Sequence, residues 1–310
     1  MILSSRSRAH YDVDDMRPER AATAAAEPTS RFFDAPGPTT NGLNLHYLDW
    51  GGDPRRHTLV LLHGGAAHAH WWDLVAPQLT PLGRVVALDF RGHGESAWTI
   101  PPHYGPQAYV EDLHALIEHL GTRPIVVGHS MGGAVVQWAA CRFPELMRAI
   151  VLVDSPNGPP PLLRRLMWRW RRRARGVGER PELDSAEAIV RKFRFSPPDT
   201  YLSREAMARL ALAGAEQLPN GRWAFRFDPH TRQWRRIGGN LRRPRLRDIK
   251  LPTLILRGAQ SGLVSAHSAR VMHREIRGSI FREIPRAFHH VPLDNPDPTA
   301  AAIAEFVRTL

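Results

Sequence analysis

The sequence is short of cysteine and of long apolar runs, and each shortage excludes a class of protein. Its 310 residues include a single cysteine, Cys141, so no disulfide can form within the chain. No stretch approaches the roughly 18 consecutive apolar residues that a membrane-spanning helix needs. The first residues, Met1–Ser7, also lack the apolar run of a secretory signal. We therefore expect a cytoplasmic protein.

Lysine is almost absent although the chain is strongly basic. The formal net charge is +12, and Lys192 and Lys250 are the only lysines among 42 Lys and Arg residues. A positive excess of this size normally suggests nucleic acid or an anionic membrane as a partner. Ala and Pro are abundant too, and this bias fits a GC-rich genome as well as a selected surface. We expect a small-molecule substrate, no nucleic acid or membrane partner, and a monomer or homodimer.

Patterns for cofactors and metals are missing as well. The sequence has no Gly-rich phosphate loop and no dinucleotide-binding fingerprint. His68 and His70 form a His-x-His pair, but no third ligand at a persuasive spacing accompanies them. We interpret the pair as loop or pocket-lining residues and predict no cofactor and no metal.

Short apolar runs alternate with helical patterns from Gly42 onward. This alternation is typical of βαβ units and a mostly parallel sheet with helices on both faces. The expected strands are 58–62, 85–88, 125–127, 150–153, 253–256 and 279–284. Between Pro156 and Asp248 the rhythm gives way to Arg-rich helical segments and prolines. We predict a flexible leader over 1–35, an α/β core over 36–154 and 249–310, and a helical cap over 155–248.

One segment carries a specific catalytic signal. Gly128–Gly132 reads Gly-His-Ser-Met-Gly and lies between an expected strand and an expected helix, Met131–Arg142. A G-x-S-x-G sequence at such a junction is a nucleophile elbow, in which a sharp turn lifts the Ser hydroxyl above the sheet. Small residues at 128 and 132 are needed because the strand and the helix approach closely there. We predict Ser130 as a nucleophile.

Three further segments match a known family in order and spacing. His63-Gly64-Gly65 follows a strand, Asp89–Ser96 reads Asp-Phe-Arg-Gly-His-Gly-Glu-Ser after the next strand, and Phe288–Pro296 follows the last strand. With the elbow, they resemble the α/β-hydrolase family from about Asn41 to the C-terminus, with the likeness weakest in the cap. The resemblance implies a serine hydrolase whose oxyanion hole is the backbone N–H groups of Gly65 and Met131. We interpret the Asp89–Ser96 turn as mainly structural.

The resemblance places the catalytic histidine near residue 289. A serine hydroxyl is a poor nucleophile at neutral pH, so an imidazole must take its proton. In similar segments one residue separates this histidine from a Val-Pro-Leu-Asp-Asn-Pro element, which selects His289 and leaves His290 as the competitor. Family members commonly have Gly where this chain has Phe288, a departure that would tighten the rim of the pocket.

The acid of the expected triad departs from the family pattern. Similar proteins carry it in a string like G-A-x-S-D after the seventh strand, whereas this chain reads Gly-Ala-Gln-Ser-Gly over Gly258–Gly262. Asp154 is the substitute we favour, because it ends the expected strand 150–153 and some haloalkane dehalogenases place their acid there. It also keeps the chain order Ser, Asp, His. A dyad assisted by water or backbone, and a site that has lost its chemistry, remain open.

These observations predict an α/β-hydrolase fold and cleavage of a carboxylic ester or related acyl bond through an acyl-enzyme on Ser130. The alternatives are a C–C bond hydrolase on the same scaffold and a non-catalytic ligand-binding homologue, the latter suggested by Gly262. Leu162–Arg175 is a basic helical pattern with interleaved aromatics. We interpret it as a cap helix over the pocket, with contact to a membrane surface as the alternative.

Overall fold

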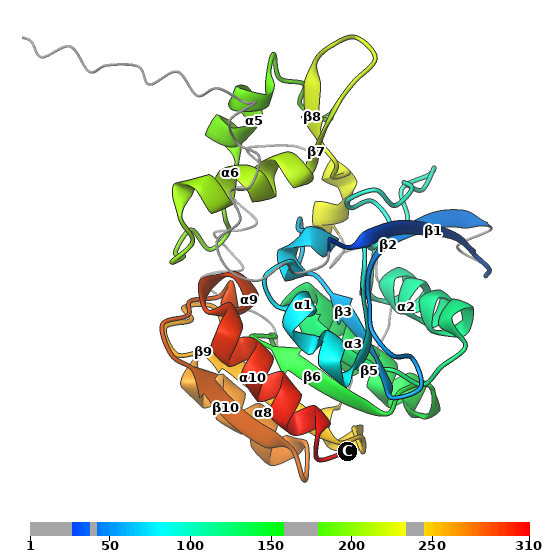
Figure 1. The fold of residues 1–310 in the computed structure, drawn as a ribbon, viewed down its shortest axis with the longest axis vertical. Helices are drawn as coiled ribbons and strands as arrows, with labels where there is room; N and C mark the ends of the chain where they lie inside the picture. Colours follow the sequence, from blue (N-terminus) through cyan, green and yellow to red (C-terminus); the bar gives the residue numbers. More distant parts are fainter. Residues whose placement is uncertain (1–26, 38–41, 158–178, 234–244) are drawn as a thin grey trace, which may run out of the picture.

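The computed structural model describes residues 27–37, 42–157, 179–233 and 245–310 (Figure 1). Residues 1–26 of the predicted leader and the basic pattern at 162–175 lie outside these ranges. Within the described ranges, none of the helices combines the length and the apolar content that crossing a bilayer requires.

One eight-stranded sheet organises the described residues, and its order is β1-β2-β4-β3-β5-β6-β9-β10. The strands of this sheet are β1 (Thr29–Ala35), β2 (Leu43–Gly51), β3 (His57–Leu62), β4 (Gly83–Leu88), β5 (Ile125–His129), β6 (Ala149–Val153), β9 (Thr253–Gly258) and β10 (Ile280–Ile284). The pairs β1·β2 and β2·β4 are antiparallel and all other pairs are parallel. Because β3, β5, β6 and β9 are parallel neighbours, the loops that follow them meet at one edge of the sheet.

Helices cover both faces of this sheet (Figure 1). The helices of the described residues are α1 (Ala76–Leu79), α2 (Pro106–Leu120), α3 (Met131–Arg142), α5 (Ala186–Lys192), α6 (Arg204–Ala213), α8 (Ala266–Glu275), α9 (Val291–Asp294) and α10 (Pro296–Val307), with 3-10 turns η2 (Ala69–Trp72), η3 (Thr80–Leu82), η4 (Pro144–Leu146), η5 (Pro229–Gln233) and η6 (Leu246–Asp248). Of these, α5 and α6 lie away from the sheet (Figure 1). Neighbouring strand residues point to opposite faces, so Leu59 packs with Leu79 of α1 and Ile303 of α10, whereas Val60 packs in the cluster of α2 and α3. The predicted α/β-hydrolase architecture is confirmed.

All six expected strands are present, and the expected helix Met131–Arg142 is confirmed. The predicted leader was wrong at its end, because residues 29–35 form edge strand β1. Phe33 and Ala35 point inward there and pair with Leu45 and Leu43 of β2. Two inward residues are too few to give a visible alternation in the sequence, so the strand was not expected.

Between β6 and β9 the chain carries an inserted segment with α5, α6 and a small hairpin of β7 (Ala215–Gln217) and β8 (Trp223–Phe225), and these four elements lie at the top of Figure 1 beyond the main sheet. The Asp89–Ser96 turn joins this segment to the core. Gly94 N donates to Arg226 O at 2.9 Å, and Asp228 N donates to Gly92 O at 2.9 Å. These bonds agree with a structural role for the turn.

A buried ion pair fixes the same turn to α2. The Arg91 guanidinium contacts the Asp112 carboxylate at 2.6 Å through Nη2 and 2.8 Å through Nε, and both side chains are fully buried. Asp112 also accepts from the backbone N–H of Arg91 at 3.1 Å. Each of the two charges thus has an opposite charge as a hydrogen-bonded partner inside the core, which a buried charge requires.

Candidate active site

Ser130 occupies the sharp turn between β5 and α3. Its backbone angles are φ 52° and ψ −109°, a left-handed conformation that a non-glycine residue adopts only under strain. Its N–H donates to Val153 O at 3.0 Å, and its own carbonyl accepts from Ala134 N at 3.1 Å. The turn is therefore held from β6 and from the helix, as a nucleophile elbow requires.

The glycines around Ser130 are needed for close packing. A Cβ on Gly128 would lie 2.6 Å from the backbone of Gly132, and one on Gly132 would lie 2.6 Å from Leu62 O. Contacts this short do not occur between real side chains and backbone. Only glycine at both positions lets β3, β5 and α3 come together under Ser130.

His289 lies beside the serine. The Ser130 Oγ donates to His289 Nε2 at 2.9 Å, although the two residues are far apart in sequence. His290, the competing base, has its Nε2 2.8 Å from Pro197 O instead. Of the two neighbouring imidazoles, His289 is the one within hydrogen-bonding distance of Ser130.

Asp154 lies on the far side of His289. His289 Nδ1 donates to Asp154 Oδ2 at 2.6 Å, and the carboxylate is completely buried. A carboxylate only accepts, so this contact fixes the tautomer with a proton on Nδ1 and a free lone pair on Nε2. The structure thus joins the predicted Ser130, His289 and Asp154 in one continuous chain of hydrogen bonds.

The loop after β9 surrounds the Asp154 carboxylate. Ser261 Oγ donates to Asp154 Oδ2 at 2.7 Å, and Gly258 N donates to Oδ1 at 3.1 Å. Val264 N donates to the same Ser261 hydroxyl at 3.1 Å, which leaves the hydroxyl proton for Asp154. A Cβ on Gly262, the usual acid position, would meet nothing within 4 Å. In this protein the loop donates hydrogen bonds to a carboxylate on another strand.

Burial sets the protonation of the site. It raises the pKa of Asp154, while the hydrogen bonds from Ser261 and Gly258 and the charge of Arg257 act in the opposite direction and favour the carboxylate. Burial, with a smaller contribution from His290, lowers the pKa of His289 to about 3. A neutral imidazole is the form that can take a proton from Ser130.

The predicted oxyanion residues lie beside the serine. A Cβ on Gly64 would lie 3.4 Å from Ser130 Cβ, and one on Gly65 would lie 3.6 Å from Met131 Sδ. No acceptor among the described residues takes the amide hydrogens of Gly65 or Met131. The next residue, Ala66, has φ 59° and donates its N–H to His93 Nε2 at 3.3 Å, which helps to fix the loop.

Two contributors escaped the sequence analysis. His129 Nε2 donates to His289 O at 2.8 Å and so holds the backbone of the proposed base. Burial keeps the pKa of His129 well below its ordinary value, which favours this neutral donor form. In the sequence, Ser261 is visible only as part of the Gly258–Gly262 loop that lacks an acid. His129 could have been singled out only by its position inside the elbow motif. Neither its bond to His289 nor the bond from Ser261 to Asp154 follows from the spacing of residues in the sequence.

Phe288, which stands where similar family members commonly have glycine, lies directly before His289 and contacts another segment. Its ring stacks on Tyr201 with centroids 5.0 Å apart. Asp294 joins these two segments, because it accepts from Phe288 N at 2.8 Å and from Tyr201 N at 2.8 Å. The segment before α6 is thereby attached beside the proposed catalytic histidine.

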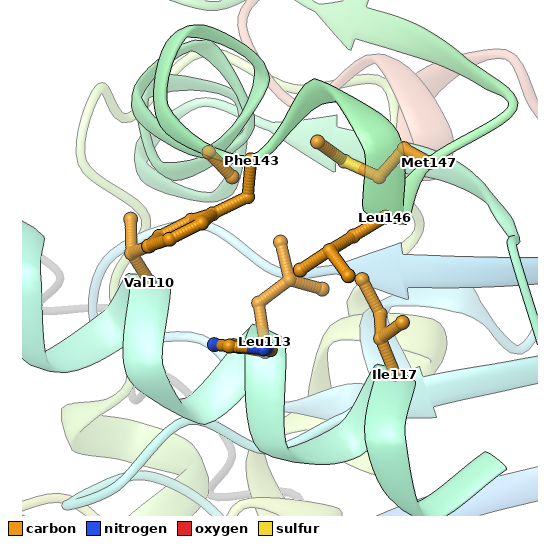
Figure 2. Close-up of a pocket in the computed structure, with 8 residues that line it drawn as sticks. Val110, Leu113, Ile117, Phe143, Leu146 and Met147 are labelled. Atoms are coloured by element: carbon orange, nitrogen blue, oxygen red, sulfur yellow. The ribbon is translucent and has the colours of Figure 1, made fainter. Parts of the chain in front are cut away.

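A small apolar pocket lies elsewhere in the molecule (Figure 2). Its lining includes Val110 and Leu113 of α2 with Phe143 and Met147 beyond α3, and it contains none of the residues of the hydrogen-bonded chain. No three His, Cys, Asp or Glu residues in the described ranges are grouped so that they could hold a metal ion. The chemically equipped site is therefore the one around Ser130.

Comparison with known proteins shows the family of the chain. A family model described as alpha/beta hydrolase fold matches residues 57–296. An esterase of Mycobacterium tuberculosis is 31% identical over 273 residues, covering 84% of each chain. The pimeloyl-[acyl-carrier protein] methyl ester esterase of Nitrosospira multiformis is 26% identical over 261 residues, covering 81% of this chain and 94% of that protein.

Solved structures share the fold. An E-2-(acetamidomethylene)succinate hydrolase aligns with a TM-score of 0.75 and 24% identity, over 91% of this chain and 99% of that one. A thioesterase domain from the curacin biosynthetic pathway aligns with a TM-score of 0.73 and 22% identity, over 92% and 100%. At these identities the likeness shows a common architecture and carries no substrate across.

Proposed function

This chain belongs to the α/β-hydrolase family, and from that premise we propose that it is a serine hydrolase that cleaves a carboxylic ester or a related acyl bond. The observation that carries the proposal is the chain of hydrogen bonds from Ser130 through His289 to Asp154. The esterase activity named for the M. tuberculosis relative, 31% identical, supports the same reaction class. We further propose a small-molecule substrate, encountered in the cytoplasm by a monomer or homodimer.

In the proposed first half-reaction, Ser130 Oγ attacks the carbonyl carbon while His289 Nε2 takes the hydroxyl proton. The carbonyl oxygen becomes negative and accepts hydrogen bonds from the N–H groups of Gly65 and Met131. Met131 is also the first residue of α3, so the positive end of the helix dipole points toward this charge. When the carbon–oxygen bond of the ester breaks, the imidazolium returns its proton to the leaving alcohol.

In the second half-reaction, a water molecule replaces the alcohol. His289 takes a proton from this water, the resulting hydroxide attacks the acyl carbonyl, and collapse of the intermediate returns the proton to Ser130. Asp154 remains ionised and stabilises the imidazolium in both steps, at the distance of 2.6 Å from Nδ1. In this proposal Asp154 takes the place of the acid that is missing at Gly262, the position that suggested a non-catalytic homologue.

Two measurements on the wild type and Ser130→Ala test the proposal. Wild-type protein is expected to hydrolyse p-nitrophenyl esters of short and medium acyl chains and to react with a fluorophosphonate at Ser130, as read by peptide mass. Ser130→Ala is expected to lose both properties while keeping its fold. Wild-type protein without ester turnover and without labelling would leave a binding protein as the better account.

A further inference from the structure

Two buried polar atoms beside the proposed active site have no hydrogen-bond partner among the described residues. They are Trp71 Nε1 and His290 Nδ1, on side chains that belong to residues 7% and 2% exposed. A buried hydrogen-bonding group without a partner destabilises the fold, so such groups are few in folded proteins. A ligand that satisfies both atoms would remove this cost.

The two side chains adjoin each other and the proposed catalytic residues. Their ring centroids are 5.3 Å apart. The ring of Trp71 lies 6.1 Å from that of His129, the residue before Ser130, and the ring of His290 lies 5.2 Å from that of His289. The unpartnered atoms thus belong to the surroundings of Ser130.

An apolar cluster that includes Trp71 lies against this pair. It contains Ala67 from the loop after β3, Trp71, Phe195, Leu210 of α6 and Leu293 of α9. The ring of Phe195 lies 4.5 Å from that of His290 and 5.4 Å from that of Trp71. Because the members come from the oxyanion loop, from the inserted segment and from the turn after the proposed base, the cluster lies where these three parts meet.

The chemistry of the pair is fixed by its other contacts. His290 Nε2 must donate to Pro197 O at 2.8 Å, since a carbonyl oxygen only accepts. Burial lowers the pKa of His290, so the imidazole is neutral and its Nδ1 carries a lone pair. Trp71 Nε1–H is a donor only. Together the two residues carry one unpartnered donor and one unpartnered acceptor, without charge, beside an apolar cluster.

We propose that Trp71 and His290 form a subsite that binds a neutral hydroxyl group of the substrate, carried on its acyl part or on its leaving alcohol. A hydroxyl accepts from the indole N–H and donates to the imidazole lone pair, so it satisfies both atoms. A carboxylate cannot donate and would face the lone pair of Nδ1. The inference rests on the proposed esterase function and narrows its substrates to hydroxylated esters with otherwise apolar chains.

The test uses two matched pairs of esters that differ by one hydroxyl. The p-nitrophenyl esters of butyrate and 3-hydroxybutyrate place it on the acyl part, and ethyl and 2-hydroxyethyl butyrate place it on the alcohol. One of the pairs is expected to show a wild-type preference in kcat/KM of about fivefold or more for the hydroxylated ester, the size of one or two net hydrogen bonds. The pair of esters that shows the preference identifies whether the subsite binds a hydroxyl of the acyl part or of the leaving alcohol.

Trp71→Phe and His290→Phe each remove one of the two hydrogen bonds and are each expected to lower this ratio toward one. Trp72→Phe is the matched control, because Trp72 also has a buried, unpartnered Nε1 but packs with Leu79 on the other face of the sheet. Trp72→Phe is expected to keep the wild-type ratio of kcat/KM between the hydroxylated and the plain ester. Every variant is measured with both esters of a pair, so a general loss of activity cancels, and if one variant does not fold the other decides.

Equal kcat/KM within both pairs, or a preference that survives both substitutions, would overturn the subsite. These outcomes are distinct from failure of the proposed function. Wild-type protein that does not hydrolyse the plain esters at all would contradict ester hydrolysis itself, whereas turnover of the plain esters without a hydroxyl preference would contradict the subsite alone.

Discussion

Ser261 donates a hydrogen bond of 2.7 Å to Asp154 from the loop in which similar family members carry their acid. The same loop contributes Gly258 N–H to the other carboxylate oxygen, and Arg257 anchors it through bonds to Val264 O and Ser261 O. Asp154, the proposed acid, directly follows β6, and the loop after β9 supplies two hydrogen-bond donors that favour its ionised form. Ser261 is a positioning residue in this account, because it acts through Asp154.

Replacing Ser261 by Ala is expected to move the pH dependence of activity. The hydrogen bond from Ser261 favours the carboxylate and lowers the pKa of Asp154 against the raising effect of burial. Without it that pKa rises further, so Asp154 takes up a proton at a higher pH on acidification. The acidic limb of kcat/KM should therefore shift to higher pH, measured across a range of buffers. Ser261→Thr keeps a hydroxyl and should restore the wild-type limb.

Ser265→Ala is the control for this shift. Ser265 accepts from Ser268 N at the start of α8 and has no contact with Asp154 in the described structure. Its loss should lower the stability of the helix end by about 1 kcal/mol and leave the pH profile unchanged. An unmoved acidic limb in Ser261→Ala would show that this hydroxyl does not act on the titrating group.

Gly258→Ala is expected to destabilise the protein by about 1 to 3 kcal/mol, the usual cost of overpacking. A Cβ there would collide with the backbone carbonyl oxygens of Phe288 and Ala287, which lead into His289. Gly262→Ala, four residues along the same loop, meets open space and should have little effect. Urea unfolding of the two variants makes the comparison, and equal midpoints would contradict the close approach of β9 to the histidine loop.

The ion pair of Arg91 and Asp112 should be important for stability. Arg91→Ala leaves the Asp112 carboxylate buried without its counter-charge and is expected to cost about 3 to 5 kcal/mol in the free energy of unfolding. Arg55→Ala breaks an ion pair with Asp53 on the surface, where Arg55 is exposed, and should leave that free energy unchanged. Denaturant unfolding measures both, and similar midpoints would argue against the buried pair as a stabilising element.

Much of the site could be predicted because its residues sit at the ends of strands. The elbow around Ser130 needs glycines at fixed spacing, and the order of strand and helix around it is visible in the apolar pattern. Asp154 and His289 follow strands β6 and β10, so parallel pairing makes their approach to Ser130 understandable from sequence. The structure brings the three together, and their catalytic roles remain predictions.

Other features depended on contacts that no local pattern encodes. His129 bonds to the carbonyl of His289, and Trp71 meets His290 only when η2 and the turn before α9 pack together. Strand β1 is not evident in the sequence, because its inward residues, Phe33 and Ala35, gain their partners only by pairing with β2. These contacts and the strand β1 thus depend on residues that are distant in the sequence, and no local pattern shows them.

The most direct test of the central claim is the kcat/KM of Asp154→Asn for p-nitrophenyl butyrate, with circular dichroism to establish that the variant is folded. An amide at position 154 can no longer stabilise the imidazolium or fix the Nδ1–H tautomer of His289. The account predicts a loss of about 10⁴-fold relative to wild type. Activity within tenfold of wild type would contradict Asp154 as the acid of the site.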